Sequence, residues 1–372
     1  MTTVNPVPPK HALAPPDPSL VAATVRAKLP FPAKFSEVKL LPGDASNRRY
    51  FRVILDGVPI KSVILMQLAE PEGFKASEEA VSAATVAINE LPFINILNHL
   101  AKAEVAVPAL YHYDQAAGLL YLQDFGDVLL SEACAGQAAA TIEELYRDAV
   151  ESLARLHLKA TTPVNQGCLA FHRGFDVALL MWEFDHFLEY GVAERNGKPM
   201  PSDDLMEVQT EFHKIADLLA AQPQIFTHRD YHSRNLMVRD TPVKGSRLGV
   251  LDFQDALMGP ATYDLASLLR DAYIALDEGL IDELISLYLS RMAGSPNVAV
   301  DPGSFRRLFD LTSIQRNLKA AGRFVYIDRV KHNPKFLADI PRVLGYVRRN
   351  LAKYPELSTL RKHLSPYVPE LQ

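Results

Sequence analysis

The stretch that decides the fold reads IFTHRDYHSRNLMVRDTPVKGSRLGVLDFQDALM and occupies residues 225–258. Its short apolar segments 225–227, 235–238 and 248–251 have the composition of strands. We expect the last two segments to pair as a tight hairpin. Such a hairpin places Asn235 beside Asp252, which ends the partner strand, and it leaves Asp230 at the mouth of the loop that precedes the hairpin.

The polar residues of this stretch are the types that magnesium-dependent phosphoryl transfer requires. One carboxylate accepts the proton of the attacking hydroxyl, while a second carboxylate and an amide oxygen hold the metal on the phosphates. We therefore assign Asp230 as the catalytic base and Asn235 and Asp252 as Mg²⁺ ligands, with His228 supporting the loop. Asp and Asn abound in ordinary loops, so the assignment depends on the full pattern H-R-D-x4-N, strand, D-F-Q.

The sequence before this stretch contains several segments with the composition of strands. PAKFSEVKLL (32–41), RRYFRVILDG (48–57) and PIKSVILMQL (59–68) are separated by turn residues and predict an antiparallel meander. A helix is expected at Phe93–Ala103 and a strand at Leu119–Gln123. Eight of the 26 prolines fall in the first 32 residues, which predicts a mobile tail without helix or strand.

After residue 127 the pattern becomes helical. Thr141 and Glu144 have the spacing of a capping box, and apolar residues recur behind them at helical intervals. The sequence thus predicts an α+β fold with a small antiparallel β-rich lobe and a larger helical lobe. The expected boundaries are 1–18 for a Pro-rich tail, 19–122 for the N-lobe, 123–127 for a hinge and 128–372 for the helical C-lobe.

Composition narrows the class of protein. The 372 residues are 48% hydrophobic, which excludes a wholly disordered chain. No apolar run approaches the roughly 18–20 residues that span a bilayer, and two cysteines are too few for a disulfide framework, so we expect a cytoplasmic protein. Residues 301–372 hold 14 basic and 6 acidic residues, but they contain no nucleic-acid-binding motif, and no nucleic-acid or membrane partner is expected.

The motifs resemble those of the aminoglycoside phosphotransferase branch of the protein-kinase-like superfamily. That branch carries H-x-D-x4-N, then I-D-F/W-x-D-A, then G-P/D-x-x-Y-D-L-A, and this chain has His228–Asn235, LDFQDA at 251–256 and GPATYDLA at 259–266. The resemblance covers most of residues 35–330. It implies the two-lobe kinase fold, ATP as phosphate donor and a structural role for Asp264, which braces the catalytic loop in the family.

Within this branch the chain is most similar to the bacterial anomeric kinases of N-acetylmuramic acid and N-acetylglucosamine, which act in peptidoglycan recycling. Residues 43–52, 228–235, 263–271 and 315–324 carry this likeness. It implies ATP-dependent phosphorylation of the C1 hydroxyl of these amino sugars by a monomer or weak dimer. The alternatives are an aminoglycoside kinase, a choline- or homoserine-type kinase, and a nucleotide-binding pseudokinase.

The nucleotide site is expected to use a turn between two strands and the segment that joins the lobes. In the turn, glycine permits tight geometry, and the polar side chains offer donors to phosphate. The predicted phosphate contacts are Gly43, Ser46, Asn47, Arg48 and Arg49. In the family, backbone groups of the joining segment bind adenine, which implies contacts around Gln123 and Phe125. Met66 stands where kinases carry a lysine, and Arg48, Arg49 or Lys61 are candidates for the missing charge.

The acceptor site is expected in the helical lobe. Arg316, Lys319 and Arg323 follow one another at offsets of three and four, so one helix face carries three cations. Such a face suits an anionic group, for example the lactyl carboxylate of N-acetylmuramic acid, better than a polycation, because arginine binds carboxylate bidentately. Three further substrate-contact candidates are Glu183, His232 and Arg234.

Overall fold

The computed structural model describes residues 14–42, 48–57, 59–69, 90–243, 245–298 and 301–372. They belong to two compact units. The first draws on Met1–Gly73 and Pro108–Asp124, and the second on Phe74–Val107 and Phe125–Gln372. Among the described helices, none is both long enough and apolar enough to cross a membrane.

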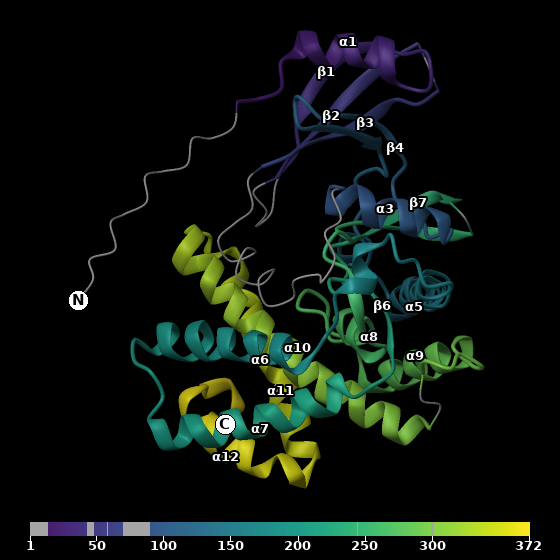
Figure 1. Ribbon diagram of the computed structural model, residues 1–372. Coiled ribbons are helices and arrows are strands. Elements are labelled where there is room, and N and C mark those ends of the chain that lie inside the picture. The colour runs from purple at the N-terminus through teal and green to yellow at the C-terminus, as the bar shows by residue number, and fades with distance from the viewer. Residues whose placement is uncertain (1–13, 43–47, 58, 70–89, 244, 299–300) are drawn as a thin grey trace. The chain divides into compact units, whose positions relative to one another are not determined.

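The first unit is an antiparallel sheet with one helix packed over it (Figure 1). The strand order is β1-β2-β3-β5-β4. Alternate residues of a strand face the same side, so Phe51, Val53 and Leu55 of the second strand share a core with Val21 and Val25 of the helix. The elements are α1 (Pro18–Lys28), β1 (Lys34–Leu40), β2 (Arg49–Asp56), β3 (Ser62–Gln67), β4 (Leu110–Asp114) and β5 (Leu119–Gln123).

The predicted meander is confirmed, because β1 pairs with β2 and β2 with β3, both antiparallel. The prediction that the first 32 residues contain no helix is wrong. Asp17 caps α1 by accepting a hydrogen bond from the Ser19 N–H at 2.8 Å, and Pro18 occupies the first turn. Proline is tolerated there because its missing N–H has no partner within a helix. The predicted tail of residues 1–18 lies mostly outside the described residues.

The second unit is mainly helical and contains two small sheets, in which β6 pairs with β9 and β7 with β8. Its strands are β6 (Gln224–Thr227), β7 (Leu236–Val243), β8 (Ser246–Val250) and β9 (Leu257–Pro260). Its principal helices are α3 (Pro92–Lys102), α4 (Leu130–Ala133), α5 (Ala139–Thr161), α6 (Val177–His186), α7 (Ser202–Ala220), α8 (Thr262–Leu269), α9 (Glu278–Arg291), α10 (Pro302–Lys331), α11 (Ile340–Lys353) and α12 (Ser358–Leu364). Short 3₁₀ turns span Leu169–His172, Pro334–Asp339, Pro355–Leu357, Ser365–Tyr367 and Pro369–Leu371, and a π-helix spans Phe187–Glu194.

Two predicted boundaries differ from the structure. The helix at 93–103 was expected in the N-terminal lobe, but α3 belongs to the second unit, where its Phe93 ring lies 5.0 Å from Phe253 and its Asn95 amide donates to the Gly167 carbonyl. The predicted capping box is also wrong. The helix α5 begins at Ala139, so Thr141 lies within its first turn and does not cap it.

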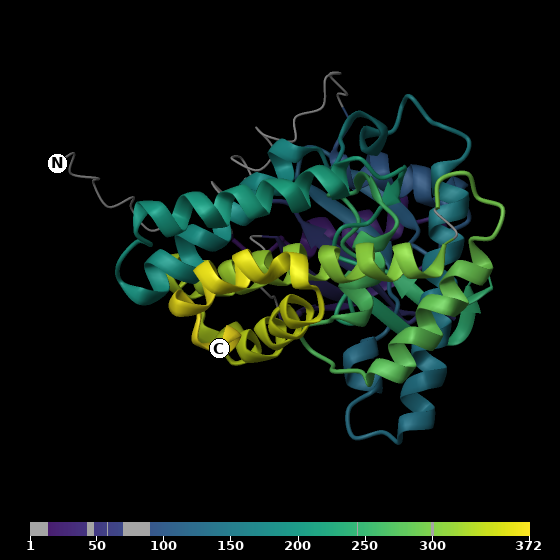
Figure 2. The ribbon, with the colours of Figure 1, turned by 90° about the horizontal axis from the view of Figure 1, so that it is seen from below.

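The long helix α10 organises the second unit. The helix α11, in the yellow part of the chain in Figure 2, packs along it, as does the π-helix that continues α6. Gly322 allows the close approach to that π-helix, because a Cβ at this position would lie 2.8 Å from the Phe187 Cα. The packing holds the middle of α10 against α6.

Candidate active site

The catalytic loop, residues 228–235, connects β6 to the β7–β8 hairpin. Leu236 pairs with Val250 at the open end of that hairpin, and the Leu251 N–H donates to the Asn235 carbonyl at 2.9 Å. Asn235 and Asp252 therefore flank the same end of the hairpin, as the sequence predicted. The following residues form β9, which pairs with β6 and returns the chain beside the start of the loop.

A buried carboxylate fixes the first half of the loop. Asp264 at the start of α8 accepts hydrogen bonds from the backbone N–H groups of His228 and Arg229 at 2.6 and 2.9 Å. It also contacts the ring of His157 at 3.1 Å. Because Arg229 has a φ of +76°, a strained conformation for a side chain of this size, these bonds hold a backbone shape that the loop would not adopt alone.

His228 ties the loop to the end of the hairpin. Its Nε2 lies 2.8 Å from the Leu251 carbonyl, and its Nδ1 accepts the Asp230 N–H at 3.3 Å. This pattern requires a neutral ring with its proton on Nε2. The imidazole thus links the backbone of Asp230 to the residue just before Asp252.

A second buried carboxylate fixes the other half of the loop, and sequence reasoning missed its role. Asp271 Oδ2 accepts the Ser233 N–H at 2.8 Å, and its Oδ1 accepts the Tyr273 N–H at 2.9 Å. Asp271 ends the quoted segment 263–271, but no spacing rule connects it to a loop 38 residues earlier. The loop is therefore held between two carboxylates, one on each side of Asp230.

Asp230 is half-buried, and its surroundings favour the ionised form. Burial alone would raise its pKa, but the charges of Lys319, His232, Arg316 and Arg229 outweigh burial and lower the pKa to about 2. The carboxylate is therefore ionised at neutral pH and ready to accept a hydrogen bond from a hydroxyl.

Asn235 and Asp252, the predicted magnesium ligands, carry oxygen atoms of the type that Mg²⁺ prefers. The Asn235 amide nitrogen donates to the Asp230 carbonyl at 2.9 Å, so its carbonyl oxygen is turned away from that bond and can serve as a ligand. Asp252 has a φ of +59° and accepts from the Gln254 amide at 2.9 Å. Within the described ranges, no cluster of three or more His, Cys, Asp or Glu could hold a metal. Mg²⁺ keeps several waters and takes few protein ligands, so one amide oxygen and one carboxylate are enough for the predicted site.

Glu183, one of the predicted substrate-contact residues, pairs with two cations. It is fully buried on α6, and its Oε1 lies 2.6 Å from the Lys319 ammonium and 3.0 Å from the Arg229 guanidinium. Its Oε2 accepts from the Gln315 amide at 2.7 Å. Burial would raise its pKa, but the two cations and these hydrogen bonds lower it. The contacts of Glu183 fix Lys319 and Arg229; direct contact with substrate stays a prediction.

The other predicted substrate residues occupy different surroundings. Arg316 is buried on α10 within electrostatic range of Asp230 and His232. The Arg323 guanidinium lies 4.7 Å from the Tyr326 ring centre. The Arg234 guanidinium stacks 3.6 Å over Tyr273 and 5.8 Å from Phe336, which is a packing role for this side chain. The His232 ring meets Tyr273 edge-on at 5.5 Å, and burial lowers its pKa.

The predicted nucleotide residues divide between the units. Gly43, Ser46 and Asn47 lie outside the described residues. Arg48 and Arg49 are half-buried in the first unit, where Arg49 lies 5.1 Å over the Phe51 ring.

In the segment that joins the two units, Gln123 and Phe125 make different kinds of contact. The Gln123 N–H donates to the Ala109 carbonyl at 2.8 Å, so this donor is used inside the sheet. Phe125 belongs to the second unit and is buried beneath Arg239, whose guanidinium lies 4.1 Å from the ring. Met66 is fully buried between Tyr50 and Leu120 on the neighbouring strands, so an apolar side chain fills the position of the kinase lysine.

Solved structures with a similar fold are small-molecule kinases. A choline kinase from Cryptosporidium parvum Iowa II aligns with a TM-score of 0.60 and 12% identity, over 92% of this chain and 98% of that one. The aminoglycoside phosphotransferase APH(2'')-Ib with ADP bound aligns with a TM-score of 0.54 and 12% identity, over 88% and 96%. At such low identity these alignments show the fold alone. The shared fold confirms the predicted two-lobe kinase-like class.

The relatives found by sequence similarity belong to a narrower class of kinases. N-acetylmuramate/N-acetylglucosamine kinases from Pseudomonas putida and Neisseria meningitidis serogroup B are each 32% identical over 334 residues. The alignment with the Pseudomonas putida kinase covers 88% of this chain and 86% of that kinase. The alignment with the Neisseria meningitidis kinase covers 89% of this chain and 90% of that kinase. The model of the phosphotransferase enzyme family (APH) matches residues 37–299. The braced loop and the hairpin carboxylate lie inside this match, and the chain belongs to the phosphotransferase enzyme family.

Proposed function

We propose that this phosphotransferase is an ATP-dependent kinase that transfers the γ-phosphate to the anomeric (C1) hydroxyl of N-acetylmuramic acid and N-acetylglucosamine in cell-wall recycling. The observation that carries the proposal is that Asp230 lies on a loop held in place by two buried carboxylates, within electrostatic range of Lys319, Arg316 and Arg229. The names of the sequence relatives support the choice of amino sugars.

The electrostatics favour a neutral or anionic acceptor. Lys319, Arg316 and Arg229 all act on Asp230, so a polycationic aminoglycoside or a quaternary amine such as choline would meet repulsion. An amino sugar with an acetylated nitrogen carries no positive charge, and N-acetylmuramic acid carries a carboxylate. This argument ranks the amino sugars above the alternative acceptors.

The low pKa of Asp230 also favours the C1 hydroxyl. A carboxylate with a pKa of about 2 is a weak base, so it orients the hydroxyl and takes its proton most readily where that proton is most acidic. The anomeric hydroxyl is the most acidic hydroxyl of a reducing sugar. In a loose transition state the proton is transferred late, so orientation matters more than basicity.

Asn235 and Asp252 would hold Mg²⁺, which, when bound, neutralises charge on the transferring phosphate. Asp252→Ala is expected to weaken Mg·ATP binding, measured as the ATP KM at varied magnesium. Lys198→Ala, an exposed residue of the second unit, is the control. An unchanged magnesium requirement would contradict the ligand assignment.

The decisive experiment is phosphate transfer from ATP to a panel of N-acetylmuramic acid, N-acetylglucosamine, kanamycin, choline and homoserine. Phosphorus NMR locates the new phosphate. We expect C1 phosphates of the two amino sugars, made by a monomer or weak dimer that needs no nucleic acid or membrane and works in the cytoplasm. Phosphate at O3 or O6, transfer to kanamycin alone, or no turnover, as in a pseudokinase, would reject the proposal.

A further inference from the structure

The three cations on one face of α10 have different local environments. The Lys319 ammonium lies 2.6 Å from Glu183 and 3.3 Å from the Tyr263 hydroxyl. The Arg323 guanidinium lies over the Tyr326 ring. Arg316 is only 7% exposed, yet within the part of the chain that the structure describes its guanidinium makes no hydrogen bond or ion pair. A mostly buried cation without such a partner in the protein is well suited to bind an anionic group of a ligand.

Arg316 also lies within electrostatic range of the catalytic loop. Its charge acts on Asp230, His232, Tyr263 and Tyr273, which lie on the catalytic loop, on α8 and just after α8. Arg323 comes seven residues later, which is about 10 Å further along the helix. A group bound by Arg316 therefore lies within electrostatic range of an acceptor hydroxyl at Asp230.

We infer that Arg316 is the specificity-determining residue that binds the carboxylate of an acidic sugar acceptor, an inference that rests on the proposed function. The two sugars differ by the lactyl ether at C3, whose carboxylate is the only fixed charge. Arginine matches a carboxylate bidentately. Lys319 instead holds the buried Glu183 carboxylate in an ion pair, which it shares with Arg229.

The exposure of Arg316 explains how one site accepts both sugars. None of its nitrogen atoms is among the fully buried polar atoms that lack a partner in the described ranges, so each keeps contact with solvent. Water can then satisfy the guanidinium when a neutral sugar is bound. A completely desolvated cation would reject the neutral sugar, because it would be left unpaired. Arg316 thus gives a preference for the acidic sugar and not an absolute requirement.

The test compares kcat/KM on N-acetylmuramic acid and on N-acetylglucosamine for wild type, Arg316→Ala, Arg316→Gln and Arg316→Lys. We expect the alanine and glutamine variants to lose about 10- to 150-fold more on the acidic sugar than on the neutral one, the usual worth of one charged hydrogen-bonded contact. The lysine variant should keep part of the preference. Arg307→Ala, which removes an exposed arginine of the same helix paired with Glu356, should leave the ratio unchanged.

The outcomes separate this inference from the proposed function. Equal losses on both sugars with a raised ATP KM would assign Arg316 to the phosphates and overturn the inference. Equal losses with an unchanged ATP KM would make its role structural and overturn it too. If Arg316→Ala does not fold, Arg316→Lys or Arg316→Gln is used instead. Calorimetric binding of the two sugars to the folded variant then compares its affinities for the acidic and the neutral sugar. Wild type that phosphorylates neither sugar would overturn the proposed function, and this inference with it.

Discussion

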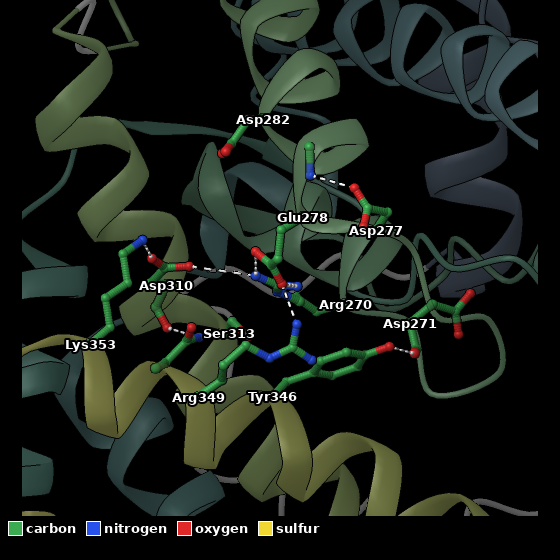
Figure 3. Close-up of polar contacts among 12 residues, drawn as sticks. Arg270, Asp271, Asp277, Glu278, Asp282, Asp310, Ser313, Tyr346, Arg349 and Lys353 are labelled. Atoms are coloured by element: carbon green, nitrogen blue, oxygen red, sulfur yellow. Dashed lines mark hydrogen bonds and ion pairs between the residues drawn. The ribbon is translucent and has the colours of Figure 1, made fainter.

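Two charged clusters that include residues of α10 differ in how their cations are paired. The Asp310 cluster contains Arg270, Glu278, Arg306, Asp310, Arg349 and Lys353. In Figure 3, Arg270 lies between Glu278 and Asp310, at 2.6 and 3.9 Å, and Lys353 reaches the other side of Asp310 at 2.6 Å. The Asp230 cluster contains Glu183, Arg229, Asp230, Arg316 and Lys319. Every cation of the first cluster has a carboxylate within ion-pair distance, whereas Arg316 of the second cluster has none among the residues that the structure describes.

The difference indicates which of the two clusters serves the reaction and which supports the fold. Asp310 and Arg316 are six residues apart, about 9 Å along α10. Ion pairs that are satisfied within the protein hold helices together and have no capacity for a ligand. A cation left without a protein partner keeps that capacity. The predictions below test whether one cluster supports the fold and the other supports the reaction.

The largest effect is expected from Asp230→Asn, which removes the base and leaves the surrounding cations. Turnover should fall about 10²- to 10⁴-fold, the usual contribution of a positioned acid or base, while ATP still binds. Single-turnover kinetics and nucleotide titration measure the two quantities. A variant that keeps more than about a tenth of wild-type turnover would contradict the assignment of Asp230 as the base.

Asp310→Ala should act on stability and not on catalysis. Its fully buried carboxylate accepts from Lys353 at 2.6 Å and Tyr354 at 2.8 Å, so its loss leaves cations uncompensated and costs about 3–5 kcal/mol of unfolding free energy. Denaturant unfolding measures the loss. Asp282→Ala is the matched control, because Asp282 is an exposed partner of Arg306 and should cost no more than about 1 kcal/mol. A lower kcat in folded Asp310→Ala would break the comparison.

Much of the Asp230 cluster follows from local sequence. The strand patterns of 225–258 predicted the hairpin that brings Asn235 and Asp252 to one end, because its strands are close in sequence and their register follows from a short turn. Spacing alone also placed three cations on one face of α10. Spacing could not show which cation is paired with a carboxylate, because the partner of Lys319 is Glu183, 136 residues earlier.

Other parts could not be predicted because they depend on tertiary contacts. Asp271 looks like any acidic residue near a helix end until the fold brings it to the Ser233 N–H. The strand β9 reads LMGP, and proline and glycine argue against a strand, yet it pairs with β6. The helix α1 forms within a proline-rich segment because Asp17 caps its first turn.

Asp271→Asn tests the second brace of the loop. Asp271 uses both oxygens, one for Ser233 and one for Tyr273, and asparagine offers only one acceptor, so one bond must be lost. We expect kcat to fall about 10-fold or somewhat more, with an unchanged ATP KM and a melting temperature only slightly below that of Ser290→Ala, an exposed control, because one buried N–H loses its partner. A raised KM with normal kcat would contradict a positioning role for Asp271.

The smallest effect concerns the acid stability of the Asp310 cluster. Hydrogen bonds from Arg270 lower the pKa of Glu278 from 4.5 to about 2, against the effect of burial. A group with a lowered pKa in the folded state contributes stability above its unfolded pKa, and that contribution is lost as pH falls from about 4.5 toward 2. Because the Glu278 side chain is 39% exposed, solvent screening limits the effect to no more than about 1 kcal/mol. Unfolding free energies from about pH 5 to about pH 3 should therefore fall more steeply for wild type than for Glu278→Gln. Equal slopes would mean that the ion pairs of Glu278 contribute nothing measurable, and the fold-supporting role would then rest on Asp310, whose carboxylate, unlike that of Glu278, has no access to solvent.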